Sequence, residues 1–130
     1  SGICVMALNE MPGIFSARWS GAHGQDVENL TLLLAQTQEV PDERRGAYFL
    51  CAAALVTPDG TERVVEGRID GDLLREPAGT GGFGYDPIFR PHGFSKTTAE
   101  LSPVEKDAIS HRGAAFRALA PVIVECLRPA

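Results

Sequence analysis

The segment YFLCAAALVTPDGTERVVEGRI, residues 48–69, predicts a β-hairpin. Residues 48–56 are almost entirely apolar, whereas residues 62–69 alternate more between apolar and polar side chains. Between them Pro58-Asp59-Gly60 has the composition of a tight turn, because proline presets φ and glycine adopts a positive φ without steric cost. Two extended segments on either side of such a turn are typical of antiparallel neighbours.

Toward the N-terminus the chain predicts one more strand and one helix. Residues 3–8 form an apolar run, which predicts a buried strand with neighbours on both faces. Asp26 is placed to cap a helix that ends before Pro41-Asp42. Its apolar face follows helical spacing and consists of Val27, Leu30, Leu33, Leu34 and Thr37.

Toward the C-terminus two helices follow each other. Ser102-Pro103-Val104-Glu105 is a capping box with proline at the first helical position, so a short helix begins there. Ser110 can cap a second helix, in which Pro121 is expected to cause a kink or a break. The expected apolar stripe of this helix is Phe116, Leu119, Ile123 and Leu127.

The segment REPAGTGGFGYDPIFRP, residues 75–91, is too rich in glycine for a helix or a regular strand. Gly79, Gly81 and Gly84 satisfy the G-x-G-x-x-G pattern, but Asp86-Pro87 prevents the helix that a dinucleotide site requires. A flexible backbone remains that could approach a ligand closely, with Phe83 and Tyr85 available for stacking. The alternative is a structural loop whose aromatic side chains belong to the core.

A second polar cluster lies at the start of the last helix. Lys106 and Ser110 are four residues apart, and His111-Arg112 follows directly. Amide groups at a helix N-terminus favour anions, and two permanent cations strengthen that preference. Taken alone, the same residues would also fit a solvated basic turn.

Composition limits the class of protein. The chain has 130 residues, 44% of them hydrophobic, and a net charge of −5, which suits one globular domain and argues against a nucleic-acid partner. No apolar run approaches the roughly 18 residues that a membrane span needs, so no membrane partner is expected. The three cysteines have no metal-binding spacing and lie in apolar segments. We therefore expect reduced thiols and a cytoplasmic protein.

Two of these segments together resemble the signature of the inosine triphosphate pyrophosphatase family. They are EPAGTGGFGYDPIF at residues 76–89 and TAELSPVEKDAISHRG at residues 98–113. SGICV at residues 1–5 and MPGIFSARWSG at residues 11–21 continue the match upstream. Each motif is weak alone, but the ordered set is specific.

The resemblance implies a fold, an activity and partners. The fold would be a mixed, elongated sheet flanked by helices in a two-lobed α/β domain. Residues 1–130 would form a single such domain that lacks its N-terminal part. The activity would be Mg²⁺-dependent hydrolysis of ITP, dITP and XTP to the monophosphate and pyrophosphate, which removes deaminated purine nucleotides, and the complete enzyme would be a homodimer. The alternatives are a purine nucleotide-binding module without hydrolysis and a pyrophosphatase for modified pyrimidines.

The resemblance also assigns site residues. The segment that matches the family's base-binding loop comprises Phe83, Gly84, Tyr85 and Asp86, and the other residues that match substrate contacts are Ser1, Lys106, His111 and Arg112. The family's general-base or metal-binding carboxylate would directly precede Ser1, so no catalytic residue and no metal ligand is assigned in this chain. We therefore expect the chain to be inactive alone, because phosphoanhydride hydrolysis needs both functions.

The chemistry of the bases fits these assignments. Hypoxanthine and xanthine carry a carbonyl at position 6 and a protonated N1, whereas adenine carries an amino donor and an unprotonated N1. Arg112 could donate to the carbonyl and Asp86 could accept from N1–H. Adenine would leave both groups unpaired, which can discriminate by about 10⁴-fold or more. Phe83 could stack on any base for roughly 1–3 kcal/mol. Guanine shares the carbonyl and N1–H, so its exclusion is not explained.

Overall fold

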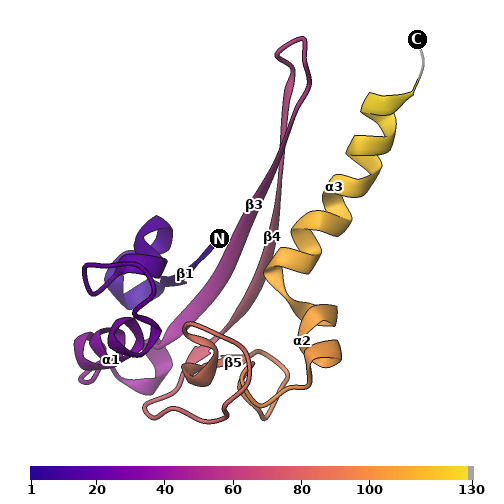
Figure 1. Ribbon diagram of the computed structural model, residues 1–130. Coiled ribbons are helices and arrows are strands. Elements are labelled where there is room, and N and C mark those ends of the chain that lie inside the picture. The colour runs from indigo at the N-terminus through magenta and orange to yellow at the C-terminus, as the bar shows by residue number, and fades with distance from the viewer. Residues whose placement is uncertain (129–130) are drawn as a thin grey trace.

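The computed structural model describes residues 1–128, which form one sheet with helices beside it (Figure 1). The strands are β1 (Gly2–Val5), β2 (Met11–Pro12), β3 (Gly46–Val56), β4 (Glu62–Leu73) and β5 (Phe89–Pro91). Their order in the sheet is β2-β1-β3-β4-β5. The predicted α/β fold with an elongated sheet is confirmed. Within the described residues every strand pair is antiparallel, whereas the resemblance implied mixed pairing.

The helices are α1 (Asp26–Gln36), α2 (Pro103–Ile109) and α3 (His111–Leu127). Short 3-10 helices connect the elements and are η1 (Met6–Leu8), η2 (Gly13–Arg18), η3 (Asp42–Arg44) and η4 (Asp86–Ile88). No helix among residues 1–128 is both long enough and apolar enough to cross a membrane.

The predicted hairpin is the longest feature of the sheet. β3 and β4 pair from Gly46 opposite Asp72 to Val56 opposite Glu62. At the turn Gly60 has a φ of 88°, which explains why glycine is needed there. The hairpin projects well beyond the other strands, and α3 lies along one side of it (Figure 1). Throughout the rest of the text, its near end is the end that pairs with β1 and β5, and its far end is the turn at residues 57–61.

β1 is shorter than the strand predicted at residues 3–8. It ends at Val5, and Met6–Leu8 form the 3-10 turn η1. Asn9 and Glu10 then both have positive φ values, 53° and 67°. This reversal brings β2 back beside β1, with Val5 opposite Met11. The predicted buried strand is therefore correct for Ile3 to Val5 but wrong beyond them, because a chain reversal follows Val5 and Met6 is 52% exposed.

Both predicted caps in the C-terminal region are confirmed. Ser102 accepts a hydrogen bond from the Glu105 amide, and the Glu105 carboxylate accepts one from the Ser102 amide, so the capping box is complete. Ser110 accepts a hydrogen bond from the Gly113 amide at the start of α3. Pro121 lies inside α3 without a break. It is exposed, so the carbonyl group that loses its helical partner lies on the side of the helix that meets water.

The predicted apolar stripe of α3 is partly wrong. Phe116 and Leu127 are 57% and 77% exposed, whereas Ala115 and Leu119 are buried. Gly67 of β4 explains this shift. A side-chain carbon added at Gly67 would lie 2.1 Å from the His111 carbonyl oxygen and 2.3 Å from the Ala115 amide nitrogen. The backbone of α3 thus packs directly against β4. Ala115 therefore lies at this contact, and Phe116 points away from it.

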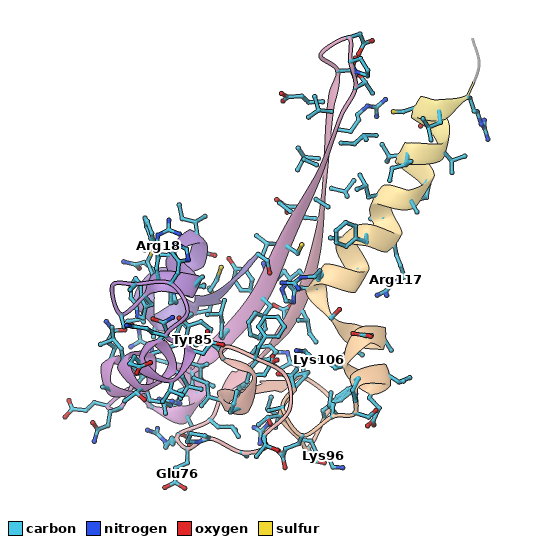
Figure 2. The ribbon with its side chains drawn as sticks, in the orientation of Figure 1. Arg18, Glu76, Tyr85, Lys96, Lys106 and Arg117 are labelled. Carbon is cyan, nitrogen blue, oxygen red and sulfur yellow. The ribbon has the colours of Figure 1, made fainter. Side chains whose placement is uncertain are left out.

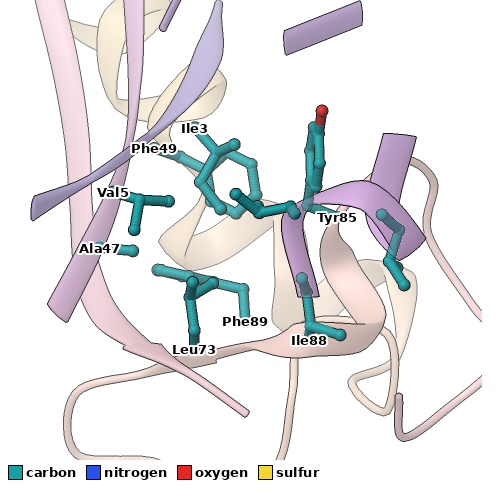
Figure 3. Close-up of a cluster of buried hydrophobic side chains, with 10 residues drawn as sticks. Ile3, Val5, Ala47, Phe49, Leu73, Tyr85, Ile88 and Phe89 are labelled. Atoms are coloured by element: carbon teal, nitrogen blue, oxygen red, sulfur yellow. The ribbon is translucent and has the colours of Figure 1, made fainter. Parts of the chain in front are cut away.

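Two hydrophobic clusters hold the fold together. The larger lies at the near end of the hairpin and joins β1, β3, β4, β5, α1 and the glycine-rich segment of residues 79–85, hereafter the glycine loop (Figure 3). In it the rings of Phe49 and Phe89 meet edge to face at 4.7 Å. The smaller cluster joins the hairpin to α3 and consists of Cys51, Ala53, Ala115 and Leu119.

Candidate functional site

A cavity of about 250 Å³ lies at the near end of the hairpin. Its walls come from the first residues of the chain, η2, α1, the glycine loop and the junction of α2 with α3. Tyr85 and Lys106 lie at this end of the molecule, whereas Arg117 lies on the outer side of α3 (Figure 2). The cavity brings together every site residue named from the sequence, namely Ser1, Phe83, Gly84, Tyr85, Asp86, Lys106, His111 and Arg112. Their individual roles stay predictions.

The glycine loop wraps around the side chain of Asp86. Gly82 has a φ of 68°, and a side-chain carbon placed there would lie 2.1 Å from Asp86 Oδ2. The Phe83 amide donates to the same oxygen at 3.0 Å. The next amide, that of Gly84, donates to Asp26 Oδ2 at 3.1 Å. The loop is therefore fixed by carboxylates from two directions, and glycine at position 82 is a steric requirement.

Asp86 is 4% exposed, and most of its acceptor capacity is already used. Its Oδ2 accepts from the Lys106 ammonium and the Phe83 amide, and its Oδ1 accepts from the Thr98 hydroxyl at 2.8 Å. A carboxylate offers about four acceptor positions, so about one remains. Asp86 therefore holds Lys106, Thr98 and the Phe83 amide in place. The sequence suggested only a contact of Asp86 with N1–H of a base and did not suggest this second role.

Phe83 is 58% exposed, and its ring faces two cations. Lys106 Nζ lies 4.5 Å from the ring centroid, and Arg112 Cζ lies 5.4 Å from it. Both distances are within the range of cation–π attraction. An exposed aromatic ring with two donors beside it suits a flat ligand that carries hydrogen-bond acceptors at its edge.

Tyr85 differs from Phe83 although the two are close in sequence. It is buried in the larger hydrophobic cluster, and its hydroxyl donates to the Ser16 carbonyl at 2.6 Å. Burial, and secondly the charge of Asp26, raise the pKa of Tyr85 to about 12. Of the two interpretations that the sequence left open, the core aromatic therefore applies to Tyr85, whereas Phe83 is exposed and its stacking on a ligand stays a prediction.

His111 is held as a neutral imidazole at the floor of the cavity. Its ring stacks on Phe49 with centroids 5.0 Å apart, and its Nε2 shares a hydrogen bond of 2.6 Å with Ser1 Oγ. Burial, and then the charge of Arg112, lower the pKa of His111 to about 4. At neutral pH the ring can therefore both donate and accept a hydrogen bond, whereas Arg112 can only donate.

Sequence reasoning assigned no site role to several residues that line the cavity, among them Ser16, Asp26, Asn29 and Phe49, whereas Ser110, which it grouped with Lys106, does line it. Asn29 is buried and accepts from the Ser20 amide at 2.7 Å, so it fixes the loop before α1. The sequence could have indicated this role, because a polar residue next to the apolar face of a predicted helix often makes a buried hydrogen bond. Asp26 was expected to cap α1, but the N-cap is Gln25, and Asp26 contacts the glycine loop instead. Ser16 lies within the MPGIFSARWSG segment, but nothing in that segment marked it as a cavity residue.

The described residues do not by themselves fit the magnesium ion that the resemblance implies. Among residues 1–128 no group of three histidine, cysteine, aspartate or glutamate side chains is close enough to hold a metal ion. Asp86, the buried carboxylate of the cavity, is paired with Lys106. Because Mg²⁺ prefers several oxygen ligands, the described residues do not form a magnesium site on their own.

The model of the Ham1 family matches residues 1–122. A dITP/XTP pyrophosphatase of Streptomyces coelicolor is 65% identical over 127 residues, which cover 98% of this chain and 64% of that protein. A dITP/XTP pyrophosphatase of Mycobacteroides abscessus is 63% identical, with 95% and 60% covered. The chain thus spans less than two thirds of the length of these curated relatives.

Solved structures show the same likeness. The crystal structure of a nucleoside-triphosphatase / dITP/XTP pyrophosphatase from Mycobacterium abscessus superposes with a TM-score of 0.83 at 64% identity, covering 93% of this chain and 64% of that one. The structure of the Staphylococcus aureus Ham1 protein has a TM-score of 0.90 at 37% identity, with 95% and 64% covered.

Proposed function

This chain belongs to the Ham1 family, and on that premise we propose that the complete protein is a nucleoside triphosphate pyrophosphatase. It would hydrolyse ITP, dITP and XTP to the monophosphate and pyrophosphate and so remove deaminated purine nucleotides. The high identity to proteins named dITP/XTP pyrophosphatase supports this activity.

The observation that carries the proposal is the pairing of Phe83 with two side chains that can only donate. Phe83 offers an exposed aromatic ring for a purine, and Lys106 and Arg112 lie over that ring, 4.5 Å and 5.4 Å from its centroid, where a stacked base would meet their donor groups. Lysine and arginine have no acceptor, so they match the carbonyl at position 6 of hypoxanthine or xanthine. Adenine would present an amino donor to the same groups and leave donors unpaired, which is costly in a desolvated site.

The remaining features of the complete enzyme are also proposals. We place the carboxylates that activate water and bind Mg²⁺ outside residues 1–128, which hold no metal-binding group, and in the part of the relatives that this chain does not cover. Residues 1–130 would then be one domain that binds the base but does not hydrolyse alone. The homodimer and the cytoplasmic location rest on the resemblance.

The test is pyrophosphate release from dITP, XTP, dATP and dGTP with and without Mg²⁺. It compares the 130-residue chain with a version extended upstream to the length of its relatives. We expect hydrolysis of dITP and XTP by the extended protein only, and only with Mg²⁺. A folded extended protein without activity would contradict the enzyme and favour the alternative, a purine nucleotide-binding module.

A matched pair of variants tests the base contact. Arg112→Leu removes a donor from the cavity, whereas Arg117→Leu removes an exposed arginine from the outer side of α3. In the extended protein the first should lower kcat/KM for dITP by about 100-fold, in line with losing a charged hydrogen bond of roughly 1.5–3 kcal/mol. The second should leave it unchanged. Equal effects of the two would contradict the assignment of Arg112.

A further inference from the structure

We propose that Thr98 is a positioning residue for base recognition, because its hydroxyl fixes Asp86 and Asp86 in turn fixes Lys106. The inference rests on the proposed function, since it concerns the same cavity. Thr98 is not among the residues that line the cavity, and neither its sequence context nor the resemblance assigns it a role.

The first step is the fixed position of Thr98 itself. Its side chain is buried, and the residue is 5% exposed. Its amide donates to the Phe89 carbonyl at 3.0 Å, which ties it to β5. Its Oγ1 lies 2.8 Å from Asp86 Oδ1 and 3.2 Å from the Asp86 carbonyl oxygen. A hydroxyl has one proton, and the shorter contact to the charged acceptor makes the carboxylate its partner.

The second step is the orientation of the Asp86 carboxylate. Its Oδ2 is held by Lys106 and the Phe83 amide, and its Oδ1 is held by Thr98. The carboxylate is thus held at both oxygens, so it cannot rotate without breaking a hydrogen bond at one of them. Without the Thr98 hydroxyl, Oδ1 would be a buried, charged acceptor with no side-chain donor. The carboxylate of Asp86 could then rotate to bring Oδ1 toward another donor.

The third step links this orientation to the base. Lys106 has a flexible four-carbon side chain, which its contact with Asp86 restrains. In that position its ammonium lies 4.5 Å from the centroid of the Phe83 ring, beside the surface proposed for stacking. Rotation of Asp86 would release the ammonium and, through the Phe83 amide, loosen the ring as well. One buried hydroxyl therefore controls both elements of the base contact.

The variants that separate this role from packing are Thr98→Val and Thr98→Ser. Valine preserves the shape of threonine but removes the hydroxyl, whereas serine keeps the hydroxyl and loses a methyl group. Thr37→Val is the control, since Thr37 is equally buried, donates to the Leu33 carbonyl and does not line the cavity. All three are made in the protein extended upstream, and their stabilities are compared by thermal unfolding.

For Thr98→Val we expect KM for dITP to rise about 10-fold while kcat changes less than about 2-fold, because the base contact lies away from the bond that is cleaved. The preference for dITP over dATP should fall by about the same factor. Thr98→Ser should restore both values to within about 3-fold of the wild type. Thr37→Val should lower stability without changing KM or the preference.

A second measurement keeps this inference separate from the proposed function. Binding of dIMP by calorimetry reads the base contact without hydrolysis, so it remains informative if the wild type releases no pyrophosphate. Weaker dIMP binding by Thr98→Val, with recovery in Thr98→Ser, supports the positioning role even then. If Thr98→Val binds dIMP and hydrolyses dITP as Thr37→Val does, the positioning role is overturned although the wild type is active.

Discussion

The near and far ends of the long hairpin differ in how their side chains are held. At the near end large side chains such as Phe49 and Phe89 fill the core. The polar groups of this end form hydrogen bonds to common acceptors. Asp86 alone links three donors there. Toward the far end the packing against α3 uses small side chains such as Ala53 and Ala115, and Val56 and Val64 are exposed. The near end therefore carries the cavity and the polar side chains proposed to recognise the base, and the far half mainly holds α3 in place.

The largest effect should come from a methyl group added at the near end. Gly82→Ala forces a positive φ on alanine and places its side chain 2.1 Å from Asp86 Oδ2. Strain and overpacking together should cost about 3–4 kcal/mol, so dITP hydrolysis by the extended protein should fall at least about 100-fold. Steady-state kinetics measure this.

The matched change at the far end is Gly60→Ala. Gly60 also has a positive φ, 88°, but an added side chain would meet nothing within 4 Å. Stability should fall by about 1–2 kcal/mol without a change in kcat/KM. If Gly60→Ala lowered kcat/KM as much as Gly82→Ala does, the proposal that only the near end serves catalysis and binding would be contradicted.

Truncating the smaller cluster should affect stability alone. Leu119→Ala leaves a cavity between α3 and the hairpin and should cost about 3 kcal/mol in the free energy of unfolding. Under conditions where the variant is folded, its preference for dITP over dATP should match that of the wild type. Urea unfolding followed by kinetics on the folded fraction would check this, and a changed preference would show that the far cluster also shapes the base contact.

The sequence predicted local structure well and long-range pairing poorly, for physical reasons. The hairpin, both serine caps and the helix at residues 26–36 follow from turn chemistry and periodicity, which act within a few residues. The stripe on α3 was partly wrong because Gly67, more than 40 residues earlier, decides which helix residues meet the strand. The spacing of apolar residues within α3 cannot show which of two neighbouring helix faces will pack against Gly67, because that glycine lies in a different element.

The site shows the same limit. The cavity gathers all the site residues that the motifs named, but the motifs did not show what each one contacts. Phe83 and Tyr85 looked equivalent in the glycine loop, and only the fold separates the exposed ring from the buried one. Asp86 looked like a ligand acceptor, but Thr98 and Lys106, 12 and 20 residues away, take up its oxygens.

The neutral state of His111 predicts a pH dependence of stability. The folded pKa is about 4, below the ordinary value of 6.5, so between these values the unfolded chain binds a proton that the folded chain does not. Stability should be fully present above about pH 6.5 and fall as the pH drops toward 4. The loss should be about 2–3 kcal/mol.

Urea unfolding at several pH values between 7.5 and 4.5 measures how the free energy of unfolding depends on pH. His111→Gln should flatten the curve in this window. The control is His23→Gln, which changes an exposed histidine that does not line the cavity. A slope that persists in His111→Gln would assign the dependence to other groups.

The smallest effect should come from the stacking surface. Phe83→Leu keeps an apolar side chain but removes the aromatic face, so binding should weaken by about 1–2 kcal/mol for every base. KM for dITP and dATP should therefore rise together, about 10-fold, and their ratio should stay constant. Kinetics with both nucleotides test this, and a rise confined to dITP would mean that Phe83 helps to select the base.

The direct contact between Gly67 and the backbone of α3 restricts how the chain can change in length. Side chains of a strand alternate between faces, so inserting one residue between Gly67 and Gly71 would turn one of the two glycines away from the backbone that it admits. The helix would then have to slide, and a displacement by one turn is about 5.4 Å, enough to carry Arg112 out of reach of Phe83. Residues added at the turn beyond Val56 would shift neither glycine. Tolerance to insertion should therefore be confined to the tip of the hairpin.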